Sequence, residues 1–169
     1  MQIILGAART VLTLSFLFYA SWSDYKTREV SNSVWIFFAP LTSALTFVEI
    51  YLYRFPQLPL YGVCFGLTTA FAVILFYSGA FGGADAKALM CLALALPFYP
   101  KNLFTPLSGE ASPISQRFFP LTVFSNSVLL AALTAFYMLL RNVFWRQKTG
   151  EKLFEGHEDE SFGRKLLVL

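Results

Sequence analysis

Charged residues are scarce in this 169-residue chain, because Asp, Glu, Lys and Arg together make up 14% of it, whereas an ordinary soluble domain holds about 25%. Histidine occurs once and cysteine twice, without a CxxC pair, so neither a zinc knuckle nor a thioredoxin-like site is expected. The net charge is only +3 and the basic residues are dispersed, which argues against nucleic-acid binding. These absences exclude a soluble globule, and we expect no metal and no cofactor.

Hydrophobic residues make up 56% of the chain, with 19 Phe, and they occur in blocks about as long as a bilayer is thick. A helix that crosses the hydrocarbon core needs roughly 20 mostly apolar residues. The fourth block is the weakest, because it approaches this length only if the glycines from Gly82 are counted. The sequence therefore predicts an all-α, polytopic transmembrane helical bundle with spans at Ile3 to Trp22, Val34 to Tyr53, Leu58 to Phe81, Ala86 to Tyr99 and Phe118 to Leu140.

Lysine and arginine predict the orientation of the spans, because cytoplasmic connections carry an excess of both. Six basic residues follow the fifth span, so residues 141–169 are expected to form a cytoplasmic juxtamembrane segment that begins a soluble subdomain. Counting back, the connections Ser23 to Ser33 and Gly82 to Lys87 are cytoplasmic, and Pro100 to Arg117 is external. We expect a multi-pass protein of the cell membrane, with residues 1–140 as its transmembrane domain.

This topology brings two aspartates to one membrane face. Asp24 lies at the cytoplasmic end of the first span and Asp85 at the cytoplasmic start of the fourth. A carboxylate at the edge of apolar sequence is costly when unpaired, and it is a functional candidate by default. Two adjacent carboxyl groups titrate as a pair. In aspartic proteases the ionised member takes a proton from water while the protonated member polarises the scissile carbonyl.

Glycines precede the second aspartate at Gly79, Gly82 and Gly83. Glycine allows close backbone approach and unusual dihedral angles, which suits a segment that brings a peptide bond against a carboxylate. An alternative interpretation is a glycine-rich hairpin in which Asp85 caps the following helix. The spacing alone gives the two interpretations equal weight.

Two runs of sequence resemble motifs of a known family. Gly82-Gly83-Ala84-Asp85 resembles the GxGD signature of intramembrane aspartic proteases, and the run from Asp24 to Asn32, DYKTREVSN, resembles the D-x-K-x-R-x-I-x-N run of type IV prepilin and archaeal preflagellin peptidases. Alanine replaces the second glycine and valine the isoleucine, and neither change removes a reacting group. The resemblance implies that Asp24 and Asp85 are the catalytic pair within residues 1–140.

The same resemblance implies a membrane-embedded aspartic endopeptidase that processes signal peptides. It would remove short basic leaders from archaellin or type IV pilin precursors at the cytoplasmic membrane face. Methyltransferase activity is not expected, because the chain lacks the cysteine-rich domain that bacterial members carry. Family members usually have six spans, so a chain with five is expected either to be truncated or to lack the sixth.

The other residues of the two motifs, and two charged residues within the spans, each have more than one possible role. Substrate positioning is one candidate role of the motif residues, although basic side chains at a cytoplasmic boundary more often anchor the topology. Arg9 and Glu49 lie toward the external ends of their spans, where we expect them to snorkel. The candidate positioning residues are Lys26, Arg28, Gly82, Gly83, Ala84 and Lys87.

A rival interpretation is a proton-coupled transporter or channel in which Asp24 and Asp85 carry protons. Against it, both acids lie near one surface rather than at the midplane of the membrane. The expected partners are archaellin or pilin precursors and the lipid bilayer. Nothing in the sequence specifies the natural precursor or the oligomeric state.

Overall fold

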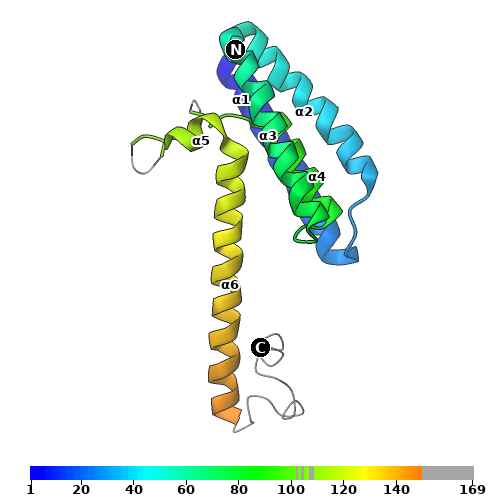
Figure 1. Cartoon of the computed structure of the whole chain (residues 1–169), viewed down its shortest axis with the longest axis vertical. Helices are drawn as coiled ribbons and strands as arrows, with labels where there is room; N and C mark the ends of the chain where they lie inside the picture. The colour runs from blue at the N-terminus through cyan, green and yellow to red at the C-terminus, as the bar shows by residue number, and fades with distance from the viewer. Residues whose placement is uncertain (102, 104, 107–108, 150–169) are drawn as a thin grey trace. The chain divides into compact units, whose positions relative to one another are not determined.

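A computed structural model describes residues 1–101, 103, 105–106 and 109–149. All regular secondary structure in these residues is helical. The chain divides into two compact units, residues 1–124 and 125–169. In chain order the helices are α1 (Gln2–Thr27), α2 (Asn32–Tyr53), the 3-10 helix η1 (Phe55–Gln57), α3 (Leu58–Tyr77), α4 (Gly83–Ala95), α5 (Pro113–Arg117) and α6 (Phe119–Thr149) (Figure 1).

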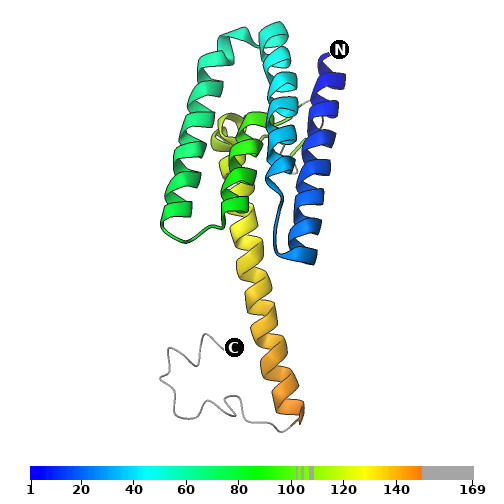
Figure 2. The same ribbon diagram turned by 90° about the vertical axis from the view of Figure 1, so that its right-hand side faces the viewer.

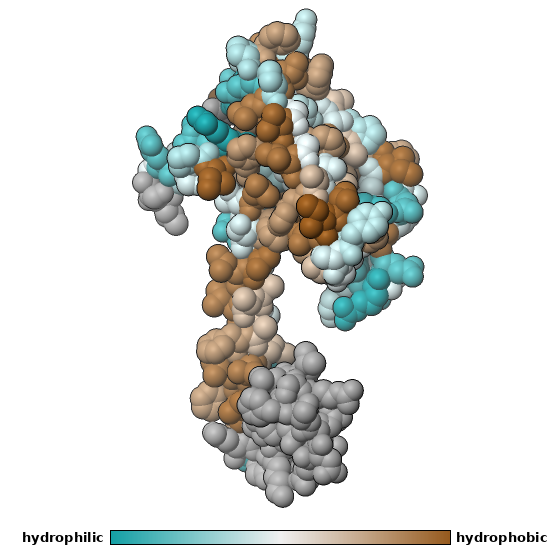
Figure 3. Space-filling model, in the orientation of Figure 1, coloured by the Kyte–Doolittle hydropathy of each residue, from teal (hydrophilic) through white to brown (hydrophobic). Residues whose placement is uncertain are grey.

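Four helical stretches are long and apolar enough to cross a membrane, namely α1, α2, η1 with α3, and Phe119–Trp145 of α6. Large apolar side chains remain exposed along them, and hydrophobic residues cover much of the visible surface (Figure 3). A water-soluble bundle would bury such side chains, whereas lipid solvates them. The predicted all-α, multi-pass architecture is confirmed. Examples of the exposed residues are Phe18, Phe37, Ile74, Leu129 and Phe136.

Helix α4 is shorter than the segment that was predicted to span the membrane there. It contains 13 residues, which corresponds to about 20 Å at 1.5 Å per residue. The helix ends at Ala95 because the residue before a proline is forced toward extended dihedrals, and Leu96 before Pro97 has φ −131° and ψ 66°. The described residues therefore contain four long spans rather than five, with α4 as a partial one.

The short helix α4 nevertheless holds a central place in the first unit. It contacts α1, α2 and α3, and Figure 2 shows it between α3 and α2. Six of its 13 residues are buried, namely Ala86, Leu89, Cys91, Leu92, Ala93 and Ala95. The small residues let neighbouring backbones approach closely, as is common between membrane helices.

Neighbouring elements satisfy the carbonyl groups at the end of α4. The last carbonyls of a helix have no partner within the helix, and in hydrocarbon each unsatisfied one would cost several kcal/mol. Side chains of α2 and α3 and the first residue of α6 supply the donors. The bonds are Tyr61 Oη to Leu94 O (3.3 Å), Thr46 Oγ1 to Ala95 O (2.9 Å), Cys64 Sγ to Pro97 O (3.5 Å) and Phe119 N to Pro97 O (3.0 Å).

A buried ion pair joins α1 to α2 at the same end of the bundle. Arg9 Nη1 lies 3.2 Å from Glu49 Oε2, and the two side chains are only 7% and 4% exposed. The expectation that both residues snorkel outward was wrong. Both charges face the neighbouring helix and each other, so the pair compensates part of the cost of removing two charges from water.

The second unit is described only through the helix α6, which runs without interruption to Thr149. The sequence placed the end of the last span at Leu140, but the helix continues beyond it. The predicted subdomain over residues 141–169 falls mostly on residues 150–169, which lie outside the described residues.

Candidate functional site

Asp24 on α1 and Asp85 on α4 line the same cavity, whose volume is about 210 Å³. Because α1, α2 and α3 run in alternating directions, the end of α1 and the start of α4 come to one end of the bundle, which we call the aspartate end. The remaining lining residues are Leu17, Ala20, Ser21, Val30, Trp35, Ala84 and Ala88.

The last turn of α1 presents the first aspartate. The helix ends at Thr27, and Arg28 adopts a left-handed conformation with φ 58°, while its N–H donates to Asp24 O at 2.8 Å. The side chain of Asp24 is exposed. The helix terminus thus fixes the backbone of Asp24 and leaves its carboxylate accessible.

The short connection between α1 and α2 is held by side chains of α1. Ser23 Oγ donates to Glu29 O at 2.9 Å, and the Thr27 hydroxyl is shared between Ser23 O at 2.8 Å and Glu29 O at 3.0 Å. Val30, which follows, lines the cavity. The motif that begins with Asp24 therefore forms a tight reversal that brings its later residues back to the first one.

A glycine turn at the end of α3 leads to the second aspartate. Gly79 has φ +74°, a conformation that side-chain-bearing residues rarely adopt. Ala80 N donates to Leu75 O at 3.0 Å and Gly79 N to Phe76 O at 3.1 Å. This pair of bonds is a Schellman motif, which ends α3 and reverses the chain toward α4.

Gly82 and Asp85 form the start of α4. Asp85 is the third residue of the helix, and its Oδ2 accepts a hydrogen bond from Gly82 N at 3.3 Å. A Cβ atom on Gly82 would lie 3.1 Å from Asp85 Oδ2, so any side chain there would crowd the carboxylate. Asp85 therefore caps the start of α4, as the alternative interpretation expected. The same residue also lines the cavity.

The two carboxylates have no ion-pair partner within the described part of the chain. No hydrogen bond joins Asp24 to Asp85. Both side chains are exposed at the mouth of a bundle whose walls are mostly apolar. Two acids in one cavity with no Lys or Arg among its lining residues provide an acceptor and a proton donor whenever they share one proton.

The three basic motif residues are not among the residues that line the cavity. Lys26 Nζ lies 4.9 Å from the centroid of the Trp22 ring, and Arg28 forms the helix end. Lys87 Nζ donates to Asn32 Oδ1 at 2.6 Å. Sequence reasoning favoured membrane anchoring for Lys87, and the structure adds a hydrogen bond that links the two motifs.

Two of the other candidate motif residues contribute to the geometry. Ala84 lines the cavity, and Gly83 begins α4, where a Cβ atom would lie 3.6 Å from the ring of Phe76. Trp35 also lines the cavity and was missed by sequence reasoning. A large aromatic residue in an apolar span resembles ordinary packing, so the sequence held no specific signal for it.

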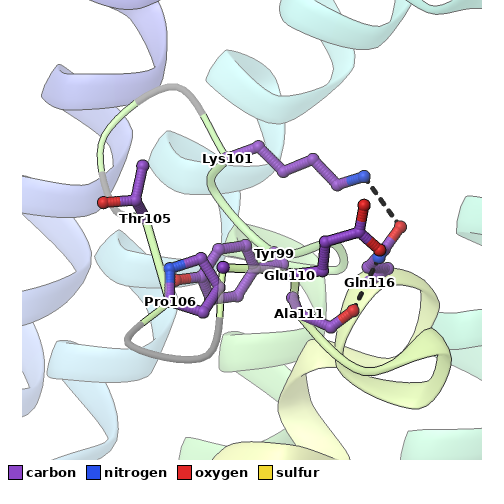
Figure 4. A pocket seen from close by; sticks show the side chains of 8 residues that line it. Tyr99, Lys101, Thr105, Pro106, Glu110, Ala111 and Gln116 are labelled. Carbon is purple, nitrogen blue, oxygen red and sulfur yellow. Dashed lines mark hydrogen bonds between the residues drawn. The ribbon is translucent and has the colours of Figure 1, made fainter.

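A larger cavity, of about 370 Å³, lies in the segment between α4 and α5. Figure 4 shows its polar bonds, Lys101 Nζ to Gln116 Oε1 at 2.7 Å and Gln116 Nε2 to Ala111 O at 2.6 Å. Neither aspartate lines this cavity, and the hydrogen bonds of its side chains hold together the segment between α4 and α5. In the described residues no three His, Cys, Asp or Glu side chains come together as a metal site.

Comparisons with known proteins agree with these motifs. The chain is 28% identical to the preflagellin peptidase of Methanococcus maripaludis over 144 residues, and 30% identical to those of Methanococcus voltae and Methanocaldococcus jannaschii over 130 and 132 residues. These matches cover 75–80% of the chain. The chain spans 54–60% of the length of these curated relatives.

Two further comparisons complete the picture. No solved structure matches the fold significantly. Residues 11–141, which include both aspartates, match the sequence pattern of one family. The chain belongs to the type IV leader peptidase family.

Proposed function

We propose that this protein is an aspartic endopeptidase of the membrane that removes short basic leader peptides from archaellin or type IV pilin precursors. The observation that carries the proposal is the convergence of Asp24 and Asp85, from separate motifs, on one cavity. Membership of the leader peptidase family and the names of the preflagellin peptidase relatives support the same activity and substrate class.

The two acids can divide the labour of one hydrolysis. The ionised member takes a proton from a water, whose oxygen adds to the scissile carbonyl carbon, while the protonated member polarises that carbonyl. When the peptide C–N bond breaks, the leaving nitrogen takes up a proton from the carboxyl pair.

The charge of the cavity fits a basic leader. Two carboxylates line it, and none of its lining residues is Lys or Arg, so a cationic peptide segment is attracted and an anionic one repelled. The leader of such a precursor lies just before an apolar helix. The apolar outer faces of α1 and α2 would let that helix stay in lipid while its leader reaches the aspartate end, which we place at the cytoplasmic face.

The rival transporter function receives less support from the geometry. A proton path needs carboxylates spaced along the depth of the membrane. Away from the aspartate end, the described spans carry the acid Glu49, which is ion-paired with Arg9. Arg9 lies about 22 Å along α1 from Asp24, at 1.5 Å per residue. No relay connects the two ends through these residues.

The decisive experiment uses the purified full chain in lipid vesicles and a panel of precursors. Each precursor carries either a basic leader or the same leader with every Lys and Arg replaced by Gln. Mass spectrometry should show loss of the leader from the basic form and at least about tenfold slower loss from the neutral one, because the cavity is anionic. Failure to cleave any precursor would refute the proposed function.

A further inference from the structure

A stripe of exposed side chains runs along α1 toward the aspartate end. Its members recur at alternating steps of three and four residues, the spacing that places side chains along one seam of a helix. The four largest members are 58–79% exposed, and Figure 2 shows α1 at the edge of the first unit. This α1 stripe consists of Val11, Leu14, Phe18, Ser21 and Tyr25.

The α1 stripe is continuous with the cavity of the two aspartates. Ser21 belongs to the stripe and also lines this cavity. A second, open cavity on the same face of α1 shares Leu17 with the first. Val11 lies about 20 Å along α1 from Asp24, at 1.5 Å per residue, so the stripe extends across most of a hydrocarbon core of about 30 Å. The second cavity is lined by Leu14, Ser15, Leu17 and Phe18.

The charges along this path fit a ligand with two unlike parts. The α1 stripe carries no charged side chain, whereas the cavity at its end holds two carboxylates and no Lys or Arg among its lining residues. An apolar helix with a cationic segment directly before it would meet these two surfaces in the matching order. A lipid tail would suit the stripe but not the acids, and a soluble cationic peptide would suit the acids but not the stripe.

We infer that the α1 stripe is the docking surface for the apolar helix of the precursor, which packs along α1 while the basic leader enters the aspartate cavity. The inference rests on the proposed function, because it takes a membrane-anchored precursor as the substrate. The spacing of the stripe favours a partner helix that crosses α1 at about 20°, and the small Ser15 beside it allows close approach. The docked helix holds the scissile bond at the depth of Asp24 and Asp85.

Photocrosslinking tests which molecule covers the α1 stripe. A p-benzoylphenylalanine replaces Phe18 in the full chain that also carries Asp85→Asn, so that bound precursor stays uncut, and the chain is irradiated with precursor in lipid vesicles. We expect a crosslink to the apolar helix of the precursor, located by mass spectrometry. The same group at Ile74, which is 65% exposed near the aspartate end of α3, should not crosslink the precursor. Crosslinks from position 18 only to lipid, to α6 or to a second copy of the chain would overturn the inference.

A kinetic measurement separates docking from chemistry. For Phe18→Ala we expect KM for the whole precursor to rise about fivefold with kcat unchanged, as the truncation of an interface anchor implies. Cleavage of a short peptide that has the leader and the cleavage site but lacks the apolar helix should be unaffected, and Ile74→Ala should leave both constants unchanged. An unchanged KM in Phe18→Ala, or an equal loss with the short peptide, would overturn the inference. If the parent chain cleaves no precursor, the proposed function fails, whereas the crosslink from position 18 still tests the docking surface.

Discussion

The two ends of the bundle treat their polar groups in opposite ways. Where α4 ends, Arg9 pairs with Glu49 and the side chains of α2 and α3 satisfy the α4 carbonyls. Where α4 begins, Asp24 and Asp85 are exposed and form no ion pair within the described residues. The contrast separates an end whose polar groups are paired, which we call the paired end, from the aspartate end, whose acids are exposed.

The first test of this contrast removes one charge from the paired end. Arg9→Met leaves the buried Glu49 without its partner, so we expect the free energy of unfolding to fall by about 3–5 kcal/mol. Unfolding of the protein in detergent measures the loss. The fraction that stays folded should cleave at the normal rate, because Arg9 lies far from the aspartates.

The matched control removes both charges. In the double variant Arg9→Met, Glu49→Leu, apolar side chains of similar volume replace the pair, which is often neutral or stabilising. Stability should therefore recover most of what the single variant lost. A single variant as stable as the parent would show that the pair does not hold α1 to α2.

The second test crowds the aspartate end without removing an acid. Gly82→Ala places a Cβ atom 3.1 Å from Asp85 Oδ2, so the carboxylate must move. We expect kcat/KM to fall about tenfold, or about 1.4 kcal/mol in activation free energy, with little change in thermal midpoint. Gly66→Ala is the control, because no atom lies within 4 Å of a Cβ there. Equal activity in both variants would contradict the proposed position of Asp85.

Helix boundaries could largely be predicted from the sequence, and helix rotation could not. The apolar blocks placed α2 and α3 within a few residues, because membrane thickness fixes their length. The end of α4 was predicted wrongly at Tyr99, although Pro97 carries the signal for it: the helix ends at Ala95, two residues before the proline. The ion pair between Arg9 and Glu49 could not be predicted, because hydropathy gives the depth of a residue but not the neighbour it faces.

The candidate site shows the same division. The order of the motifs and the alternation of spans brought Asp24 and Asp85 together in the prediction, and the cavity agrees with it. The hydrogen bond from Lys87 to Asn32 and the place of Trp35 in the cavity wall depend on side-chain directions at one end of the bundle. Such directions follow from packing between helices, on which a single sequence is silent.

A third prediction concerns the end of α4. Thr46→Val removes a hydroxyl whose single proton is shared between Thr42 O of its own helix and Ala95 O of α4, each 2.9 Å away, and we expect a loss of about 0.6–1.7 kcal/mol in unfolding free energy. Thr134→Val is the control, because the hydroxyl of Thr134 donates to Leu130 O of its own helix. If both variants lose the same stability, the bond between α2 and α4 has no special role.

The smallest expected effect concerns the link between the motifs. Lys87→Met and Asn32→Ala each remove one partner of an exposed hydrogen bond, so we expect a two- to threefold loss of kcat/KM, or about 0.5 kcal/mol. In a double-mutant cycle the two losses should not add. The cycle of Lys26→Met with Asn32→Ala should be additive, and coupling of the same size there would contradict a specific link.

The central claim is that Asp24 and Asp85 act as one unit, and the most direct measurement of it is the cleavage rate of their asparagine variants. Asp24→Asn and Asp85→Asn each keep the size of the side chain and remove one carboxyl group. Each should lower kcat by at least about 10⁴-fold, and the double variant should be no worse than either, because residues that act together lose most of their rate at the first removal. The thermal midpoints should stay near that of the parent. Full activity in either single variant, or losses that multiply in the double variant, would contradict the pair.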